Sequence, residues 1–235
     1  MTTRTHMALR QARDLGAGLG TVALVTVAVG HLITQLLVDY WAEGMLNRQL
    51  ARERTPRLNA ISDIISSTAD TPVIIGVTAT AAFAFRIAFQ RWRESVFLIV
   101  AVTAQSWIFL LATVFVPRSR PSVPHLDAAP PTSSYPSGHA SAAMACYFGI
   151  ALVLILHMRH RVVLSLLWGV LGLTLAIGVA WARVYRGMHY FTDVVWGLLL
   201  GLVCLLVTGW VILLRPHPGT RGDPDGASQR SDPAS

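Results

Sequence analysis

Two segments of the chain carry polar residues of the types that handle phosphate esters. Residues 116–141 read VPRSRPSVPHLDAAPPTSSYPSGHAS, and residues 182–193 read ARVYRGMHYFTD. Both contain arginines, whose guanidinium groups match phosphate oxygens bidentately. They also supply His139 and His189, and one histidine can attack phosphorus while the other delivers a proton. Together, these residues predict a site for chemistry on a phosphate ester.

Spacing within the two segments supports this interpretation. His189 and Asp193 are four residues apart, so we expect them to share a face where the last apolar stretch begins. The carboxylate would then accept a hydrogen bond from one ring nitrogen and leave the other free to attack. Ser137 is a good N-cap for the apolar stretch that follows it, and the amides of that first turn, with Gly138, form an anion site.

The elements that position these segments are membrane-spanning helices. The chain has 235 residues, of which 53% are hydrophobic and 13% charged, whereas soluble proteins have about 25% charged residues. The mean hydropathy is +0.52. All 19 basic residues are arginines, scattered between apolar runs without the stripe that nucleic-acid binding requires. We therefore predict an integral membrane protein that binds membrane lipids and no nucleic acid.

Six apolar stretches reach or approach the roughly 20 residues that a spanning helix needs. They cover residues 17–38, 71–89, 95–116, 140–158, 162–182 and 194–214. The predicted fold is all-α, a membrane bundle of six transmembrane helices over residues 17–214. An N-terminal tail (1–16) precedes it, and a disordered tail rich in Pro, Gly, Ser and Asp (215–235) follows it.

Two finer features concern the helices themselves. Leu58, Ile61 and Ile65 follow helical spacing and predict a short amphipathic helix on the membrane surface. Gly197 and Gly201 form a GxxxG pattern in the last span, which favours close packing of helices within the chain over dimerisation. The sequence does not predict an oligomeric state.

The placement of the arginines predicts how the protein is oriented in the membrane. An even number of spans puts both termini on one side, and the two short loops on that side hold five arginines within residues 86–93 and 159–161. The positive-inside rule then places both termini in the cytoplasm of a multi-pass cell-membrane protein. The loops at 39–70, 117–139 and 183–193 face outward, so we expect the site at the extracytoplasmic helix ends.

Three motifs in order resemble a known family. Arg120-Pro121, then Pro136-Ser137-Gly138-His139, then Arg183 with His189 and Asp193 at its spacing are similar to the signature motifs of the type 2 phosphatidic acid phosphatase superfamily. That group includes bacterial lipid phosphate phosphatases and shares its site with vanadium haloperoxidases. The motifs occupy residues 113–193, and the six-span pattern covers almost the whole chain.

The resemblance implies a role for each matching residue. His189 would be the nucleophile that forms a phosphohistidine, Asp193 would orient it, and His139 would protonate the leaving oxygen and then activate water. The phosphoryl oxygens would be held by Arg120, Arg183, Ser137 and the Gly138 amide. The family requires no metal and no other cofactor. The implied substrate is a lipid phosphate or diphosphate of the undecaprenyl pyrophosphate, phosphatidylglycerophosphate or phosphatidic acid class.

Two positions depart from the family pattern. Thr113 stands where the first motif usually has lysine, and Ala182 stands where the third usually has serine. Arg118, two residues from Arg120, is the candidate to replace the missing charge in the phosphate site. The departures also leave open a catalytically weakened protein of the same fold that binds lipid phosphates. A transporter would need a polar path, for which His31, Gln35 and Gln105 are the candidates.

Overall fold

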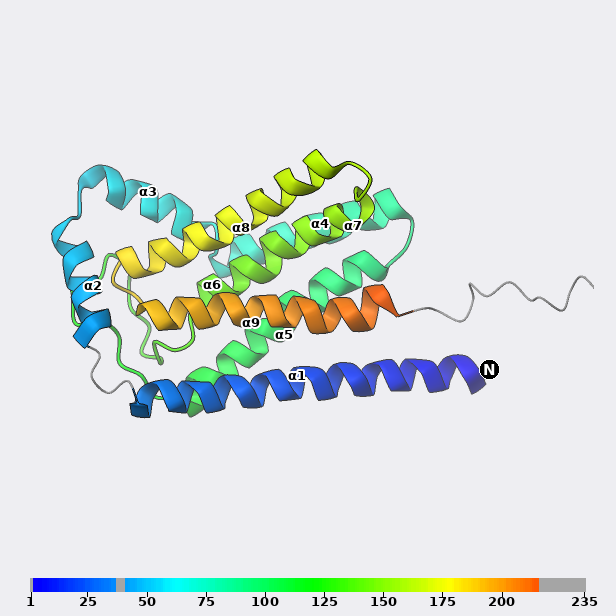
Figure 1. The fold of residues 1–235 in the computed structure, drawn as a ribbon, viewed down its shortest axis with the longest axis horizontal. Helices are drawn as coiled ribbons and strands as arrows, with labels where there is room; N and C mark the ends of the chain where they lie inside the picture. Colours follow the sequence, from blue (N-terminus) through cyan, green and yellow to red (C-terminus); the bar gives the residue numbers. More distant parts are fainter. Residues whose placement is uncertain (1, 37–40, 216–235) are drawn as a thin grey trace, which may run out of the picture.

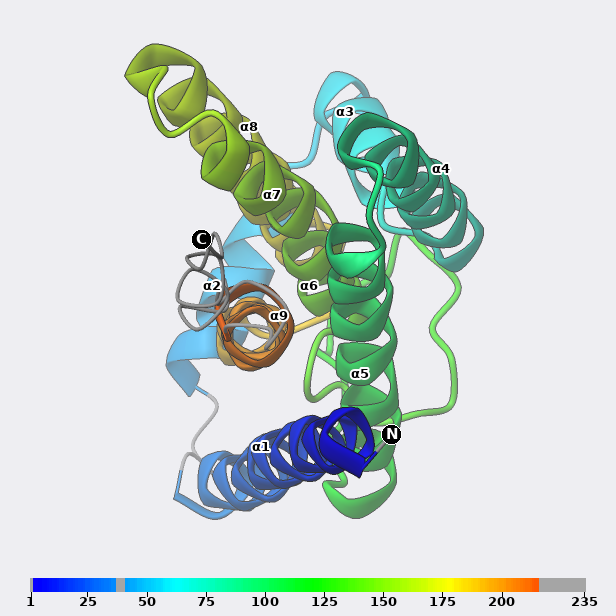
Figure 2. The same ribbon diagram turned by 90° about the vertical axis from the view of Figure 1, so that its right-hand side faces the viewer.

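The structure, a computed structural model, describes residues 2–36 and 41–215. Its elements are α1 (Thr2–Leu36), α2 (Trp41–Arg52), α3 (Pro56–Ser67), α4 (Thr71–Phe89), α5 (Arg93–Phe115), α6 (Gly138–Ala143), η1 (Met144–Phe148), α7 (Gly149–His157), α8 (Val162–Tyr185), α9 (Phe191–Gly209) and η2 (Trp210–Leu214). The long helices run along the length of the molecule, and α2 and α3 lie at one end (Figure 1). Viewed along that axis, α9 is seen end-on among α1, α5 and α6 (Figure 2).

Within the described part of the chain, six stretches are long and apolar enough to cross a membrane. They are Leu9–Gln35, Thr71–Phe89, Arg93–Phe115, Gly138–His157, Val162–Tyr185 and Phe191–Leu214. The all-α fold with six transmembrane helices is thus confirmed. The residues expected to form an N-terminal tail continue the first helix instead, since α1 begins at Thr2. Of the tail predicted at 215–235, all but Arg215 lies outside the described residues.

The fourth span is not one regular helix. Between α6 and α7 it passes through η1, a single turn of π-helix at Met144–Phe148. Such a turn holds one extra residue within an otherwise α-helical segment and occurs often near functional sites. Here it separates the short helix that opens with Gly138 from the apolar half that ends at His157.

Glycines bring the fourth and sixth spans together. A Cβ atom on Gly197 would lie 2.6 Å from the carbonyl oxygen of Ser137, and one on Gly201 would lie 2.5 Å from that of Ser141. Neither distance leaves room for a methyl group, so only glycine permits this approach. The GxxxG pattern therefore packs α9 against α6, as predicted, and sets the start of α6 beside the start of α9.

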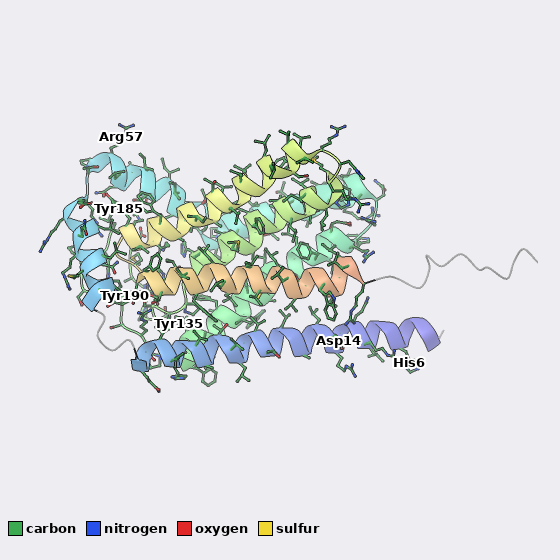
Figure 3. All side chains as sticks on the ribbon, viewed as in Figure 1. His6, Asp14, Arg57, Tyr135, Tyr185 and Tyr190 are labelled. Carbon is green, nitrogen blue, oxygen red and sulfur yellow. The ribbon has the colours of Figure 1, made fainter. Side chains whose placement is uncertain are left out.

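The first helix is tied to the bundle near both ends. Tyr135 donates from its hydroxyl to the Thr26 carbonyl oxygen (2.9 Å), and Arg215 pairs with Asp14 (2.6 Å). Figure 3 labels Asp14 near the N-terminal end of α1 and Tyr135 toward the other end. These contacts hold α1 along α5 and α9.

The first loop forms two helices that contact α8. The predicted amphipathic helix is present as α3, but Leu58 and Ile61 on it are exposed, and its buried residues are Ser62 and Ser66. The two buried serines accept hydrogen bonds from arginines of the third motif region, and Ile65 packs against an apolar cluster that includes Ala176 and Val179 of α8. Thus α3 packs on the protein through both polar and apolar contacts.

Candidate active site

The motif loops meet where α6 and α9 begin. Ser137 donates its backbone N–H to the Asp193 carbonyl oxygen (3.0 Å), and Leu126 donates to the carbonyl oxygen of Arg186 (3.1 Å). Tyr185 and Tyr190, labelled in Figure 3, mark this end of the molecule at the close of α8 and the start of α9. The fold therefore gathers all three motifs at one end of the bundle.

His189 lies just before α9 and is 4% exposed. Its Nδ1 atom is 2.7 Å from the carbonyl oxygen of Ser134. A carbonyl oxygen can only accept, so Nδ1 carries the proton and Nε2 holds the free lone pair. The sequence predicted Asp193 as the acceptor for one ring nitrogen, but the acceptor is the Ser134 carbonyl, since Asp193 Oδ2 is 3.7 Å from Nδ1.

Asp193 is fully buried, and its carboxylate accepts from three groups. Its Oδ2 atom accepts from the Tyr190 backbone N–H (2.9 Å), which caps α9, and from the Ser134 hydroxyl. Its Oδ1 atom pairs with Arg118. At 3.7 Å from Nδ1, the carboxylate acts on His189 as a nearby negative charge.

Arg118, which the sequence suggested for the phosphate site, is paired with two carboxylates in the structure. Its guanidinium is fully buried and binds Asp193 on one side and Glu43 of α2 on the other, the latter at 2.7 Å. Burial lowers the pKa of Arg118, but the two carboxylates outweigh it and raise that pKa above its usual value. Glu43 also accepts from the Thr192 backbone N–H (2.7 Å), so it links α2 to the first turn of α9.

His139 is the second residue of α6. Its Nε2 atom lies 3.2 Å from Oδ1 of Asp70, the residue that precedes α4. The side chains of Arg183 and His189 are near enough to act on it electrostatically. The structure thus brings the two motif histidines into one site. A carboxylate lies near each of them: Asp70 near His139 and Asp193 near His189.

Asp127 clamps two arginines of the third motif region. It accepts from Arg183 Nη1 (2.7 Å) and from Nε and Nη2 of Arg186. Burial opposes ionisation of Asp127, yet both guanidinium groups hold its pKa below the ordinary range. Ser66 on α3 also accepts from Arg183 (2.9 Å). Arg183 is therefore fixed in place from one side.

Three buried donors of motif residues have no acceptor among the described residues. They are the Ser137 hydroxyl, Nε of Arg120 and Nε of Arg183. Arg120 is held by one bond from Nη1 to the Met188 carbonyl oxygen (2.8 Å). A buried donor without a partner carries the full desolvation penalty, and a phosphate oxygen is a suitable acceptor for each of these donors.

The electrostatics of the site keep His189 neutral. Burial lowers the pKa of His189, and the charges of Arg183 and Arg120 lower it further against the opposing influence of Asp193. A neutral imidazole with a free Nε2 can attack an electrophile.

Several supporting residues were missed in the sequence. Asn47 of α2 donates to the carbonyl oxygens of Val184 and His189 (3.4 and 3.2 Å), and Ser134 holds both His189 and Asp193. A usable signal existed for α2, since Glu43 and Asn47 are four apart and share a helical face. No spacing indicated Ser134.

The family model of the PAP2 superfamily matches residues 94–215, just over half of the sequence. The chain belongs to the PAP2 superfamily. An 82-residue stretch of it is 37% identical to phosphatidylglycerophosphatase B of Bacillus subtilis (strain 168), covering 33% of this chain and 38% of that relative. The matched stretch thus spans well under half of the relative's length.

Two solved structures share the PAP2 fold with this chain. The transmembrane PAP2-type phosphatidylglycerolphosphate phosphatase from Bacillus subtilis aligns with a TM-score of 0.72 at 22% identity, covering 82% of this chain and 94% of that one. Aquifex aeolicus LpxE aligns with a TM-score of 0.54 at 20% identity, covering 70% and 92%. The transmembrane Bacillus subtilis structure and the six apolar helices support a multi-pass membrane protein. Within residues 2–36 and 41–215, no cluster of three His, Cys, Asp or Glu side chains could hold a metal ion.

Proposed function

We propose that this PAP2 chain hydrolyses a lipid phosphate or diphosphate through a phosphohistidine on His189. The observation that carries the proposal is the set of buried donors on Ser137, Arg120 and Arg183 that have no acceptor among the described residues. They belong to three different motifs, and the charges of Arg120 and Arg183 act on the neutral His189. Donors held ready for oxygens that gain negative charge stabilise a phosphoryl transition state.

The reaction divides into two displacements. In the first, Nε2 of His189 attacks phosphorus, the P–O bond to the lipid breaks, and His139 gives its proton to the leaving oxygen. In the second, His139 takes a proton from water, the oxygen of that water attacks phosphorus, and the P–N bond breaks to release inorganic phosphate. Asp193 stabilises the positive ring of the intermediate. Asp70 lies where it can stabilise His139 when that ring is protonated.

Phosphatidylglycerophosphate is the substrate that we propose first. The support is the similarity to a relative called phosphatidylglycerophosphatase B. Undecaprenyl pyrophosphate and phosphatidic acid present the same terminal phosphate to the arginines. We further propose that the site faces outward and that both termini are cytoplasmic, because the short loops at the other end hold five arginines.

Phosphate release from these three lipids by detergent-purified protein tests the proposal. We expect turnover that persists in excess EDTA and is inhibited by vanadate, which mimics the five-coordinate transition state. His189→Ala should reduce turnover by at least about 10³-fold. His6→Ala, an exposed histidine at the far end of α1 (Figure 3), is the matched control and should leave it unchanged.

The intermediate can be trapped directly. In His139→Ala, which lacks the group that activates water, substrate labelled with ³²P should leave label on the protein that is stable to alkali and lost in acid. The same label should be missing from His139→Ala/His189→Ala. Lipid binding without phosphate release in the wild-type protein would favour a binding protein of the same fold, and alkali-labile label would point to a different nucleophile.

A further inference from the structure

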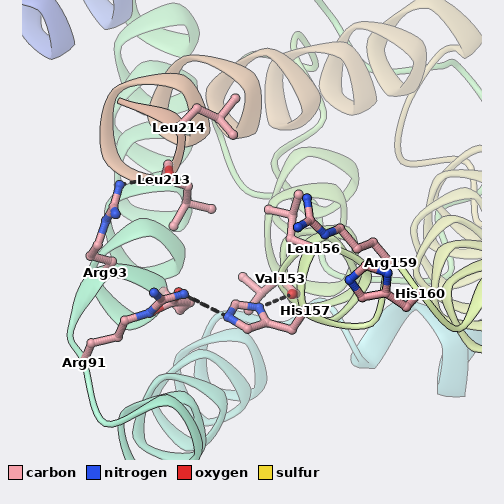
Figure 4. A pocket seen from close by; sticks show the side chains of 10 residues that line it. Arg91, Arg93, Val153, Leu156, His157, Arg159, His160, Leu213 and Leu214 are labelled. Carbon is pink, nitrogen blue, oxygen red and sulfur yellow. Dashed lines mark hydrogen bonds and ion pairs between the residues drawn. The ribbon is translucent and has the colours of Figure 1, made fainter. Parts of the chain in front are cut away.

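A pocket lined by charged and apolar side chains lies at the end of the bundle opposite the candidate active site. It has a volume of about 380 Å³ and is formed by the start of α5, the end of α7 with the loop that follows it, and the end of η2. Figure 4 shows its side chains pointing toward one another from these elements. None of them takes part in the proposed hydrolysis.

The pocket is positively charged. Arg91, Arg93 and Arg159 line it, and Glu94 is the one acidic residue in its lining, so its net charge is +2 with both lining histidines neutral. Glu94 is buried and pairs with Arg91 at 2.5 Å. The charge of Arg91 is thereby matched, and those of Arg93 and Arg159 remain for a ligand.

Arg93 is held rigidly. Its Nε and Nη2 atoms donate to the carbonyl oxygens of Ile212, Leu213 and Arg215 at the end of η2, at 2.8–3.1 Å. Nη1 has no hydrogen-bond partner among the described residues. A guanidinium fixed in this way loses little conformational entropy when it binds an anion. That distinguishes it from an arginine that extends freely toward lipid headgroups.

On the opposite wall, Arg159 and His160 follow α7, and neither side chain has a partner within the described ranges. The lining also contains apolar side chains, among them Leu156 of α7 and Leu214 of η2, both of which are exposed. Cationic donors beside exposed apolar side chains, at one end of the spanning helices, suit a phosphate group attached to a hydrophobic body.

We propose that this pocket binds a phosphate group, carried by an anionic phospholipid headgroup or present as free inorganic phosphate. Arg93 supplies the fixed donor, and Arg159 with His160 closes over the bound oxygens. The site is independent of the proposed hydrolysis and lies at the other membrane face.

Native mass spectrometry tests the proposal. Purified protein is incubated with equal amounts of dioleoylphosphatidylglycerol and dioleoylphosphatidylcholine, and the bound lipid is counted. We expect the wild type to retain the anionic lipid preferentially and Arg159→Ala/His160→Ala to lose about tenfold in its affinity, because charge-assisted bonds are removed. Arg161→Ala is the matched control: the same loop, the same charge, but outside the pocket lining. It should retain the lipid.

Equal retention of the two lipids, or an equal loss in the control, would overturn the proposal, because the arginines would then act only as a general positive surface. Addition of excess inorganic phosphate distinguishes a lipid headgroup from free phosphate as the source of the bound phosphate group. Displacement of the lipid with a phosphate adduct in its place means that free phosphate suffices. Persistence of the lipid means that the apolar lining residues contribute to binding and that the lipid headgroup is the ligand.

Discussion

The protonation state of His189 is the chemical property of the site most open to measurement. Burial lowers its pKa, with Arg183 and Arg120 adding to the shift, so His189 keeps its lone pair below the usual value of about 6.5. We expect the acid limb of kcat/KM assigned to His189 to lie below that pH. An acid limb at or above it would show that the histidine is not held neutral.

Two substitutions should move that limb in opposite directions. Asp193→Asn removes the charge that favours the imidazolium, so the limb should shift to lower pH. Arg120→Gln removes a charge that opposes it, so the limb should shift to higher pH. Both variants lose rate, and pH profiles of single-turnover reactions separate the shift from the loss. Movement of both limbs the same way would contradict the arrangement of charges around His189.

The ion pairs of Arg118 predict an effect on stability, whereas its spacing from Arg120 suggested a role in binding phosphate. Arg118→Ala leaves the buried carboxylates of Asp193 and Glu43 without their shared cation, which should cost about 3–5 kcal/mol of folding stability. Thr113→Lys in that background should restore nothing. Thermal unfolding in detergent, with exposed Arg57→Ala as the control, measures the stability loss. A wild-type melting temperature with a rate rescued by Thr113→Lys would instead return Arg118 to the phosphate site.

Among the helices, the contact between α6 and α9 sets the geometry of the site. Gly201→Ala would bring a methyl group against the Ser141 carbonyl oxygen and force the two helices apart. We expect a loss of about 1–3 kcal/mol in stability, together with reduced turnover, because Ser137 and Asp193 separate. Gly76→Ala, where nothing lies within 4 Å, should be neutral or slightly stabilising. Similar melting temperatures for the two variants would argue against this packing.

The sequence predicted the helices better than it predicted contacts between residues that lie far apart along the chain. Span positions followed from apolar runs, and the Gly197–Gly201 spacing correctly indicated close packing. The spacing of His189 and Asp193 predicted their proximity but not the acceptor, because Ser134 reaches His189 only through the fold of the loop before α6. Likewise, Glu43 meets Arg118 only because α2 folds back beside the start of α9. The spacing of residues within one segment does not predict how the chain folds back.

For the molecule as a whole, the separation of its two polar ends allows a test of orientation. Thr132 is exposed in the loop at the end of the candidate active site, and Arg161 is exposed at the other end. In a background without Cys146 and Cys204, Thr132→Cys should react with an impermeant thiol reagent added outside intact cells. Arg161→Cys should react only after the membrane is opened. The reverse pattern would place the candidate active site in the cytoplasm.

The π-helical turn at Met144–Phe148 makes the fourth span unequally tolerant of genetic change. Successive residues of an α-helix are about 100° apart around its axis. Loss of a single codon between His139 and the end of α6 would therefore turn His139 by about 100° relative to α7 and carry it away from its partners. Loss of a single codon within η1 would instead remove the extra residue of the π-helical turn and leave a regular α-helical turn. Over evolutionary time this span can drift in composition, but η1 is the place where it can lose a residue.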